Sequence, residues 1–417
     1  MCRSTSRSLG SRVVKIVMTG RPTVVIDAGA CSLSETSIAG VGLRLTEMAR
    51  TLSRRYAVRV IAPPCSDSVS LGAADQVAPG DEAERAIATA DAVIFFDTPD
   101  RHRIELAVSY RARIIAECRA PIEHMSYPSV LACSDPVGEH QRFLGPYRRL
   151  LEVSHHFICR SKVERAALIA TLCTVGRVTP EDISKSPTLD HLLTTVPVGF
   201  GLHGMEMADA AEQMHLADFL WTGGIWNFFE PLMFVEAMAI LRDRGVDATA
   251  AFLHAVPTED TRPAIDGITK AIKRLGLARQ VRLHRKPMTQ FERERYVKAA
   301  QAYVCIARPG AENETGTRLR LRDTWLHGVP TVIDPWGISS DIVARENLGI
   351  VLSDPGPKEL AGALEQVKAG AVERPGRRME RLYESSMAPF MRWLDESCSS
   401  CSRGLDPKSM NVEEETT

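Results

Sequence analysis

The first half of the chain alternates short apolar runs with stretches of helical spacing. Runs rich in β-branched residues predict buried strands at residues 23–29, 57–62, 92–96, 114–117 and 156–159. After the first of them, Leu45, Met48 and Leu52 recur on one face of a helix predicted over residues 43–55. Strands and helices that alternate in this way indicate a parallel sheet covered by helices on both faces.

The pattern breaks at residues 193–201, where Pro197, Gly199 and Gly201 interrupt it, and then begins again. A second set of strands is predicted at 219–221, 249–253, 281–283, 302–306, 331–333 and 350–352, with helices at 231–244, 262–275, 290–299, 319–327 and 358–368. The predicted fold class is therefore α/β, with two Rossmann-like, doubly wound domains. Ligand crevices of such sheets lie at the carboxyl ends of the strands, so two facing domains would form a cleft.

These breaks set the expected domain boundaries. Residues 21–205 form the predicted N-terminal domain and residues 206–376 the C-terminal domain, after a flexible leader over residues 1–20 that contains no acidic residue. Leu382, Phe390 and Trp393 give a last helix, over residues 377–396, enough apolar surface to pack across the domain junction. The serine-rich and acidic residues 397–417 are expected to form a disordered tail.

Composition narrows the function classes. The chain has 51 Lys and Arg against 52 Asp and Glu, a balance that argues against nucleic acid or an anionic membrane as partner. No apolar run is long enough to span a membrane, so we expect a cytoplasmic protein. Cys398 and Cys401 have the spacing of metal ligands, but no second pair follows them, and we assign no metal site. The oligomeric state stays open.

Two glycine-rich loops carry candidate chemistry. Gly40 and Gly42 fall between the first predicted strand and its helix, where backbone amides can approach a substrate, although a purely structural turn is an equal alternative. Arg44 and Glu47 follow on one helix face and either pair with each other at the surface or reach into the cleft. The second loop follows the strand at 219–221, has no lysine of a Walker motif, and exposes amides for a diphosphate over Gly223, Gly224, Ile225, Trp226 and Asn227.

A dense cluster of charge lies between residues 312 and 323. Its acids can accept hydrogen bonds from ribose or sugar hydroxyls, and its arginines can pair with phosphate oxygens; the members of interest are Glu312, Glu314, Arg318, Arg320 and Asp323. The alternative is a solvated helix face.

Together, these segments resemble a branch of the family 4 retaining glycosyltransferases, which have the GT-B fold. The resemblance covers most of residues 22–370 and rests on collinear segments at 39–50, 159–161, 176–180, 195–199, 223–231 and 312–330. It implies transfer of a sugar from a nucleotide-diphosphate sugar to a small-molecule or glycan acceptor, with retention of configuration and with no metal or cofactor. The N-terminal domain would hold the acceptor, and specialised metabolite biosynthesis is one expected setting.

The resemblance also implies roles for individual residues. Gly40 and Gly42 would lie near the transferred sugar, the 223–227 turn would contact the diphosphate, and Arg318 with Arg320 would form the basic pair. Asp323 takes the place of the second acid of the family motif, but the position of the first acid is Thr315, so Glu312 or Glu314 must replace it and the choice stays open. Acceptor contacts are expected from Arg44, Arg119 and His124.

The chain departs from the family where a basic pair should follow the glycine turn. Arg285 and Lys286, or Arg318 and Arg320, are candidates to neutralise the leaving diphosphate. Glu117 replaces an aspartate and would accept a proton or a hydrogen bond from the acceptor. His124, His155 and His156 are candidate bases, with ordinary packing as the alternative. The departures leave two other functions open: coupling of a cyclitol by a pseudo-glycosyltransferase, and an inactive nucleotide-binding or scaffold protein.

Overall fold

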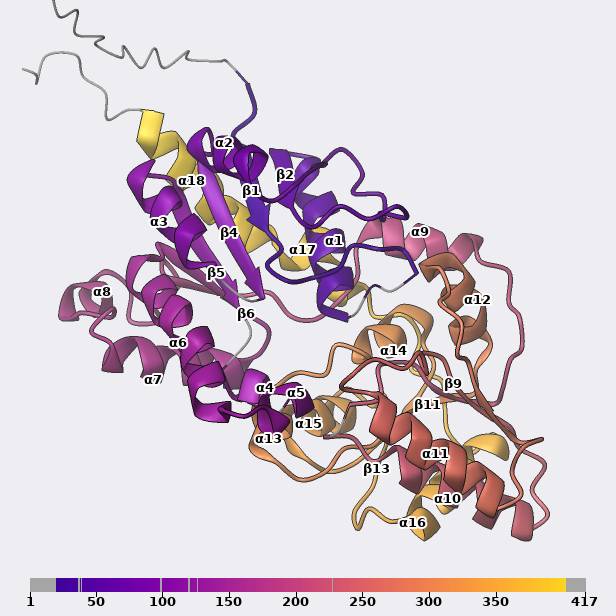
Figure 1. The fold of residues 1–417 in the computed structure, drawn as a ribbon. Helices are drawn as coiled ribbons and strands as arrows, with labels where there is room; N and C mark the ends of the chain where they lie inside the picture. The colour runs from indigo at the N-terminus through magenta and orange to yellow at the C-terminus, as the bar shows by residue number, and fades with distance from the viewer. Residues whose placement is uncertain are drawn as a thin grey trace, which may run out of the picture.

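The computed structural model describes residues 20–402, except residues 37, 39, 98, 99, 119, 120, 126 and 227. Within this range the chain forms two parallel sheets, of seven and six strands, each flanked by helices (Figure 1). The predicted α/β class with two doubly wound domains is therefore confirmed. The expectations for residues 1–19 and 403–417 lie outside the described residues.

The N-terminal sheet has the strand order β3-β2-β1-β4-β5-β6-β7. Its strands are β1 (Thr23–Asp27), β2 (Ala57–Ile61), β3 (Asp75–Val77), β4 (Ala92–Asp97), β5 (Arg113–Cys118), β6 (His156–Cys159) and β7 (Leu193–Thr195). Alternate side chains enter two cores, because Val24 and Ile26 pack on one face and Val25 on the other. A strand buried on both faces is apolar throughout, which is why β1 and β4 were readable from the sequence.

The described part of the N-terminal region contains eight helices. They are α1 (Gly40–Ser53), α2 (Asp81–Ala88), α3 (Arg101–Ser109), α4 (Pro121–Met125), α5 (Pro128–Ala132), α6 (Pro136–Val153), α7 (Lys162–Thr174) and α8 (Pro180–Lys185). Local signals start several of them: the side chains of Asp100, Asp135 and Ser161 each accept a backbone N–H in the first turn of α3, α6 and α7. In Figure 1, α4 lies beside α13 of the second domain.

The C-terminal sheet has the order β10-β9-β8-β11-β12-β13, again all parallel. Its strands are β8 (Phe219–Trp221), β9 (Ala250–Phe252), β10 (Val281–Leu283), β11 (Ala302–Cys305), β12 (Thr331–Ile333) and β13 (Gly349–Val351). The accompanying helices are α9 (Leu202–Ala210), α10 (Pro231–Asp243), α11 (Arg262–Arg274), α12 (Gln290–Ala299), α13 (Ala311–Thr315), α14 (Leu321–His327), α15 (Gly337–Arg345) and α16 (Pro357–Lys368). The strand order reverses between β1 and β4 in one sheet and between β8 and β11 in the other, the points where such folds bind ligands.

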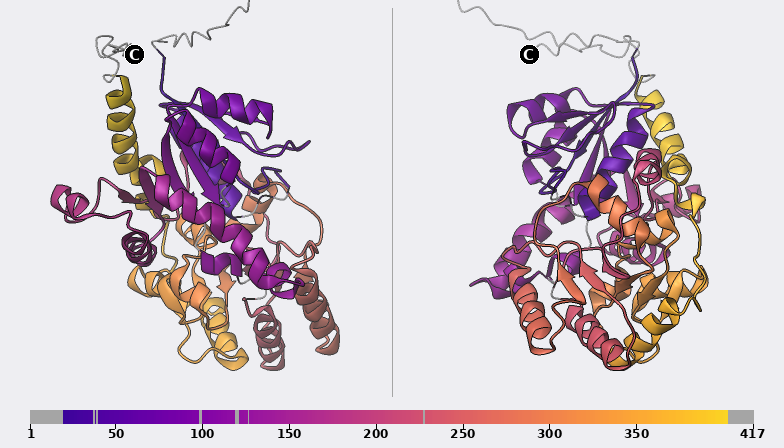
Figure 2. Two further views of the ribbon diagram at one scale, coloured as in Figure 1. Left: turned by 60° about the vertical axis from the view of Figure 1, so that its left-hand side comes forward. Right: turned by 90° about the vertical axis from the view of Figure 1, so that its right-hand side faces the viewer.

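After α16 the chain returns to the N-terminal domain. It forms a short 3₁₀ turn η1 (Met379–Arg381), then α17 (Tyr383–Ser386) and α18 (Ala388–Ser402), instead of the single helix expected over residues 377–396. Figures 1 and 2 show α18, in yellow, alongside the N-terminal domain. Tyr383, Phe390 and Leu394 pack in the same core as Val24 and Leu45. α18 therefore covers one face of the first sheet, and it continues to Ser402, into the segment expected to be tail.

The two crossings between the domains run side by side. Phe200, in the first crossing, forms a parallel bridge with Leu382 in the second, and Phe200 N donates to Arg381 O at 3.1 Å. A Cβ on Gly199 would lie 1.9 Å from Arg381 O, so only glycine permits this approach. No helix among the described residues is long and apolar enough to cross a membrane.

Candidate functional site

The glycine turn of the second domain lies directly after β8, at the reversal point of its sheet. Arg320 crosses this turn: a Cβ on Gly223 would lie 2.8 Å from the carbon of its guanidinium, and its Nη2 donates to Gly224 O at 3.0 Å. The antiparallel bridge between Phe229 and Ala307 holds the end of the turn against β11. The absence of a side chain at position 223 is therefore what lets the guanidinium reach the turn.

The Arg320 guanidinium is held among aromatic rings. Its central carbon lies 4.0 Å from the ring centroid of Phe229 and 5.0 Å from that of Trp221. Burial lowers the pKa of Arg320, and it forms no ion pair with any described residue, while its Nη1 is buried without a hydrogen-bond partner. Because a cation removed from water without a partner anion is costly, this position is suited to an anionic ligand.

Arg318 has a different environment from the one predicted for a basic pair. Its Nη1 and Nη2 donate to the two carboxylate oxygens of Asp334 at 2.6 and 2.9 Å, and Nη1 also donates to Cys305 O at 3.1 Å. Burial opposes its charge, but Cys305 and the Asp334 carboxylate outweigh burial and raise the pKa of Arg318. The structure therefore corrects the prediction: Arg318 fixes α14 to β12, and Arg320 alone lies at the turn.

The predicted donor-site acids also separate. Asp323 is buried and pairs with both terminal nitrogens of Arg293, at 3.0 and 2.5 Å. Its carboxylate is therefore used in an ion pair inside the domain and does not face a nucleotide-sugar ligand. On α13, Glu312 is half-buried and Glu314 is exposed, and the Thr315 hydroxyl donates to Ala311 O at 2.9 Å. Of the two glutamates, only Glu312 is turned toward the interior of the protein.

The remaining donor-side candidates lie around this turn or at the surface. The Ile225 side chain is fully buried in the core, so only its backbone can meet a ligand. Trp226 is half-buried and meets Tyr127 of the N-terminal domain edge-on, with ring centroids 5.5 Å apart. Arg285 and Lys286 are exposed, and Arg285 donates to Thr269 on α11 at 2.6 Å. Asn227 lies outside the described residues.

The start of α1 forms the opposing wall. A Cβ on Gly40 would lie 3.1 Å from the Cβ of Leu319 in the second domain, and a Cβ on Gly42 would lie 2.9 Å from Ser32 O. Gly40 is thus needed for the close approach of the two domains, and Gly42 for local packing. The N-terminal domain also touches the second domain where Thr317 N donates to Glu164 Oε1 at 3.3 Å.

Arg44 and Glu47 do not pair with each other at the surface. Arg44 borders a small cavity between the domains, and Glu47 lies inside the domain interface. Arg44 is buried and donates from Nε to Glu117 at 2.9 Å, and to Tyr383, Val196 and Pro197 at 2.8–3.0 Å. Burial raises the pKa of Glu117, and the neighbouring Arg44 only partly opposes this. Glu47 pairs with Arg322 of α14 at 2.7 Å, inside the domain interface. Both residues therefore hold the two domains and the chain crossings together.

A cavity of about 20 Å³ lies where the two domains meet, room for about one water molecule. It is lined by Val41, Arg44, Phe96, Asp97, Glu117, Glu123, Arg160 and Leu319. Asp97 is a member that the sequence analysis missed. It ends β4 beside the reversal point of the first sheet and is buried with a left-handed backbone (φ 63°), which is rare for a residue other than glycine. An acid directly after an apolar strand was the signal available in the sequence.

The three candidate histidines lie at two different places in the N-terminal domain. His124 of α4 stacks on Phe143, with ring centroids 4.3 Å apart. His155 and His156 lie at the amino end of β6, whereas residues that face the cleft lie at the carboxyl ends of the strands. His155 Nδ1 accepts a hydrogen bond from Ile114 N at 3.0 Å. Of the two alternatives for these histidines, cleft base or ordinary packing, their contacts therefore fit packing. Arg119 lies outside the described residues.

His156 instead supports the contact between β6 and α18. It stacks on Trp393 at 4.1 Å, and its Nε2 lies 2.8 Å from the Thr194 hydroxyl. Burial lowers its pKa from 6.5 to about 3. Between these values the unfolded chain binds a proton that the folded imidazole does not, so the stability that His156 contributes is complete above pH 6.5 and is lost as the pH falls.

Because His156 binds a proton only in the unfolded chain, we expect the free energy of unfolding to decrease by about 1.4 kcal/mol for each pH unit that the pH falls below 6.5. Urea unfolding from pH 7 to pH 4 measures it, and His156→Gln should show a shallower dependence than the parent. The exposed His102 serves as control through His102→Gln. An unchanged slope in His156→Gln would show that another group carries the pH dependence.

No protein-family model and no curated protein sequence matches this chain. Solved structures do. HepE from Anabaena, in complex with UDP and glucose, superposes with a TM-score of 0.56 at 12% identity, over 92% of this chain and 100% of HepE. α,α-Trehalose 6-phosphate synthase from Burkholderia multivorans gives 0.58 at 11% identity, over 92% and 98% of the two chains. A glycosyltransferase from Rickettsia africae gives 0.53 at 10% identity, over 91% and 97%.

The chain has the GT-B fold. In this GT-B protein the start of α1 and the glycine turn after β8 face the junction of the two domains, with Arg320 beneath the turn and the cavity next to Leu319. Among the described residues, no three His, Cys, Asp or Glu side chains gather in an arrangement that would hold a metal ion.

Proposed function

We propose that this protein is a retaining glycosyltransferase that moves a sugar from a nucleotide-diphosphate sugar to a hydroxyl of a small-molecule or glycan acceptor. The observation that supports it best is Arg320, a cation that lies across the Gly223–Gly224 turn and pairs with no carboxylate among the described residues. The turn follows β8 at the point where a doubly wound sheet binds ligands. A diphosphate there would accept hydrogen bonds from the turn and from the guanidinium.

In this mechanism the bond between the anomeric carbon and the phosphate oxygen breaks as the acceptor oxygen bonds to the same face of the sugar. The acceptor proton passes to the departing phosphate oxygen, so atoms and charge balance without a covalent intermediate. Negative charge develops on the diphosphate as it leaves, and stabilising this charge is the main electrostatic requirement of the reaction. Arg320 and the backbone amides of the turn would stabilise it. We propose that neither a metal ion nor an organic cofactor is required.

The N-terminal domain would hold the acceptor. Asp97, Glu117 and Glu123 bring carboxylates to the cavity between the domains, beside the Leu319 contact. Closing the domains around the donor would exclude water, which would otherwise hydrolyse the sugar. We propose a cytoplasmic enzyme of biosynthesis, with specialised metabolites as one setting.

A transfer assay tests the proposal. The protein is incubated with UDP-glucose, UDP-galactose, GDP-mannose, ADP-glucose or dTDP-glucose and a panel of sugar, cyclitol and aglycone acceptors, and products are identified by mass and by the NMR coupling of the anomeric proton. We expect one donor to be consumed and the product to keep the α configuration of the donor. An inverted product contradicts the retaining mechanism. Nucleotide binding without transfer to any acceptor would favour an inactive binding protein.

A further inference from the structure

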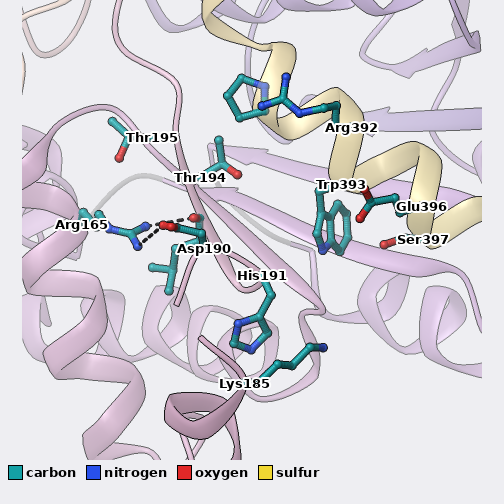
Figure 3. A pocket seen from close by; sticks show the side chains of 12 residues that line it. Arg165, Lys185, Asp190, His191, Thr194, Thr195, Arg392, Trp393, Glu396 and Ser397 are labelled. Carbon is teal, nitrogen blue, oxygen red and sulfur yellow. Dashed lines mark hydrogen bonds and ion pairs between the residues drawn. The ribbon is translucent and has the colours of Figure 1, made fainter. Parts of the chain in front are cut away.

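A groove of about 700 Å³ lies on the N-terminal domain, outside the domain junction (Figure 3). Its floor is the edge strand β7, and its walls are α7 and α8 on one side and α18 on the other. The polar and aromatic side chains that line it are Arg165, Lys185, Asp190, His191, Thr194, Thr195, Arg392, Trp393 and Glu396. β7 is three strands away from β4, about 14 Å across the sheet. The groove is therefore separate from the candidate active site, and its volume is typical of a ligand-binding site.

The groove is built from fixed parts. Trp393 stacks on the buried His156, while Phe390 and Leu394 anchor α18 in the core beside it. On the other wall, Arg165 donates to Leu193 O at 2.9 Å and pairs with Asp190 at 3.0 Å. Both walls belong to the N-terminal domain and its last helix, so domain closure would not change the groove. Groups held in advance bind a ligand at a lower entropic cost.

The charges of the groove are mixed and nearly balanced. Arg165, Lys185 and Arg392 face Asp190 and Glu396, and the first of these cations is already paired with Asp190. A nucleotide or another polyanion requires a clear excess of positive charge, which this lining lacks. A lipid requires a mostly apolar lining, and of the lining residues only Leu193, Pro389 and Trp393 have apolar side chains.

The lining instead suits an uncharged ligand with many hydroxyl groups. Each hydroxyl both donates and accepts, and the groove offers donors on Arg392 and Lys185 and acceptors on Asp190 and Glu396. The Thr194 and Thr195 hydroxyls already contact His156 and Cys159, so they are not counted among these groups. The indole of Trp393 supplies a flat apolar wall for the carbon face of a sugar ring. We infer that this groove is a second binding site, for a neutral oligosaccharide. If the proposed function is correct, a glycan becomes the favoured acceptor class, and this one step rests on that function.

The test is direct binding of the full chain to an array of neutral and acidic glycans, with affinities then measured by calorimetry for the neutral tetrasaccharides maltotetraose, cellotetraose and chitotetraose. We expect saturable binding of at least one neutral glycan. Glu396→Gln, on the exposed part of α18, should weaken that binding about tenfold, and Trp393→Ala should weaken it further. Arg274→Ala on the exposed face of α11 is the matched control and should bind like the parent.

Three results would overturn the inference: no binding of any neutral glycan, binding that Glu396→Gln and Trp393→Ala leave unchanged, or a groove that takes acidic glycans or inorganic phosphate instead. Trp393→Ala also removes the contact with His156, so the melting temperature of this variant is measured to check its folding. If Trp393→Ala is unstable, the binding measured with Glu396→Gln alone tests the site. UDP binding in the Glu396→Gln protein separates the two proposals, because the donor site should be unaffected. Glycan binding without sugar transfer would leave this site standing and reject the proposed enzyme.

Discussion

Replacing Arg320 with methionine is expected to remove about half or more of the thermal stabilisation that a nucleoside diphosphate gives this protein. A ligand present at 100 times its Kd stabilises the folded state by about 2.7 kcal/mol. Hydrogen bonds to charged groups are worth about 1.5–3 kcal/mol, so loss of the guanidinium should weaken binding by about 10- to 100-fold. At the same ligand concentration this removes about half of the stabilisation at the lower end of that range and most of it at the upper end. Thermal unfolding with UDP, GDP, ADP and dTDP measures it, and UDP is tested first because HepE was solved with UDP.

The unliganded Arg320→Met protein provides a second measurement. In the parent, the cation is held against Phe229 and Trp221 and has no carboxylate partner in the described part of the chain. A methionine of similar length should therefore leave the stability unchanged or raise it. A purely structural arginine would give the opposite result, a loss of stability with the nucleotide response intact. Arg285→Met is the control, because Arg285 was also a candidate for the diphosphate but is directed to Thr269 on α11. If Arg285→Met removes the shift and Arg320→Met does not, the assignment of the diphosphate site is wrong.

Arg322→Ala should be the most destabilising single substitution at the domain interface. Arg322 is buried between Glu47 of the first domain, at 2.7 Å, and Glu294 of the second, at 3.3 Å. Its removal leaves two carboxylates in the interior without their shared partner, a change that typically costs about 3–5 kcal/mol. Urea unfolding followed by tryptophan fluorescence measures the loss.

Two variants check the cause of this loss. Arg244→Ala breaks the exposed pair with Glu365, also 2.7 Å long, and should cost less than about 1 kcal/mol because water screens it. Glu47→Gln keeps the shape of the side chain but removes the charge, and should cost less than Arg322→Ala because Arg322 retains Glu294. A Cβ on Gly204 of α9 would lie 2.1 Å from Glu47 Oε1, so the pair has no room to move aside. Equal costs for the buried and the exposed arginine would show that the interface does not depend on this pair.

The sequence predicted the sheets well because their strands are buried on both faces. β11 and the first five residues of β4 are continuous apolar runs, and such a pattern indicates burial on both faces. β3 and β7 were not predicted as strands: each has three residues at the edge of the sheet, and β3 reads Asp-Gln-Val. Short edge strands carry little apolar signal, because only part of their surface meets the core.

The candidate site was predicted less completely, because its contacts join distant parts of the chain. Helical spacing suggested that Arg44 and Glu47 pair with each other, yet their partners are Glu117 and Arg322, 73 and 275 positions away. In the same way, Arg318 and Arg320 are equivalent in the sequence, and only the fold gives one of them an aspartate and leaves the other at the glycine turn. Local patterns identify charged groups but do not determine their partners.

The return of the chain end to the first domain has a consequence for biosynthesis of the protein itself. Tyr383, Met387, Phe390, Leu394 and Cys398 complete a core whose other members belong to residues 24–196. During translation the ribosome releases those earlier residues long before it makes this last helix. Until then, the apolar face of the first sheet that α1 and α18 share is covered only in part. The second domain, whose core needs few residues beyond 370, is able to finish folding sooner than the domain that precedes it.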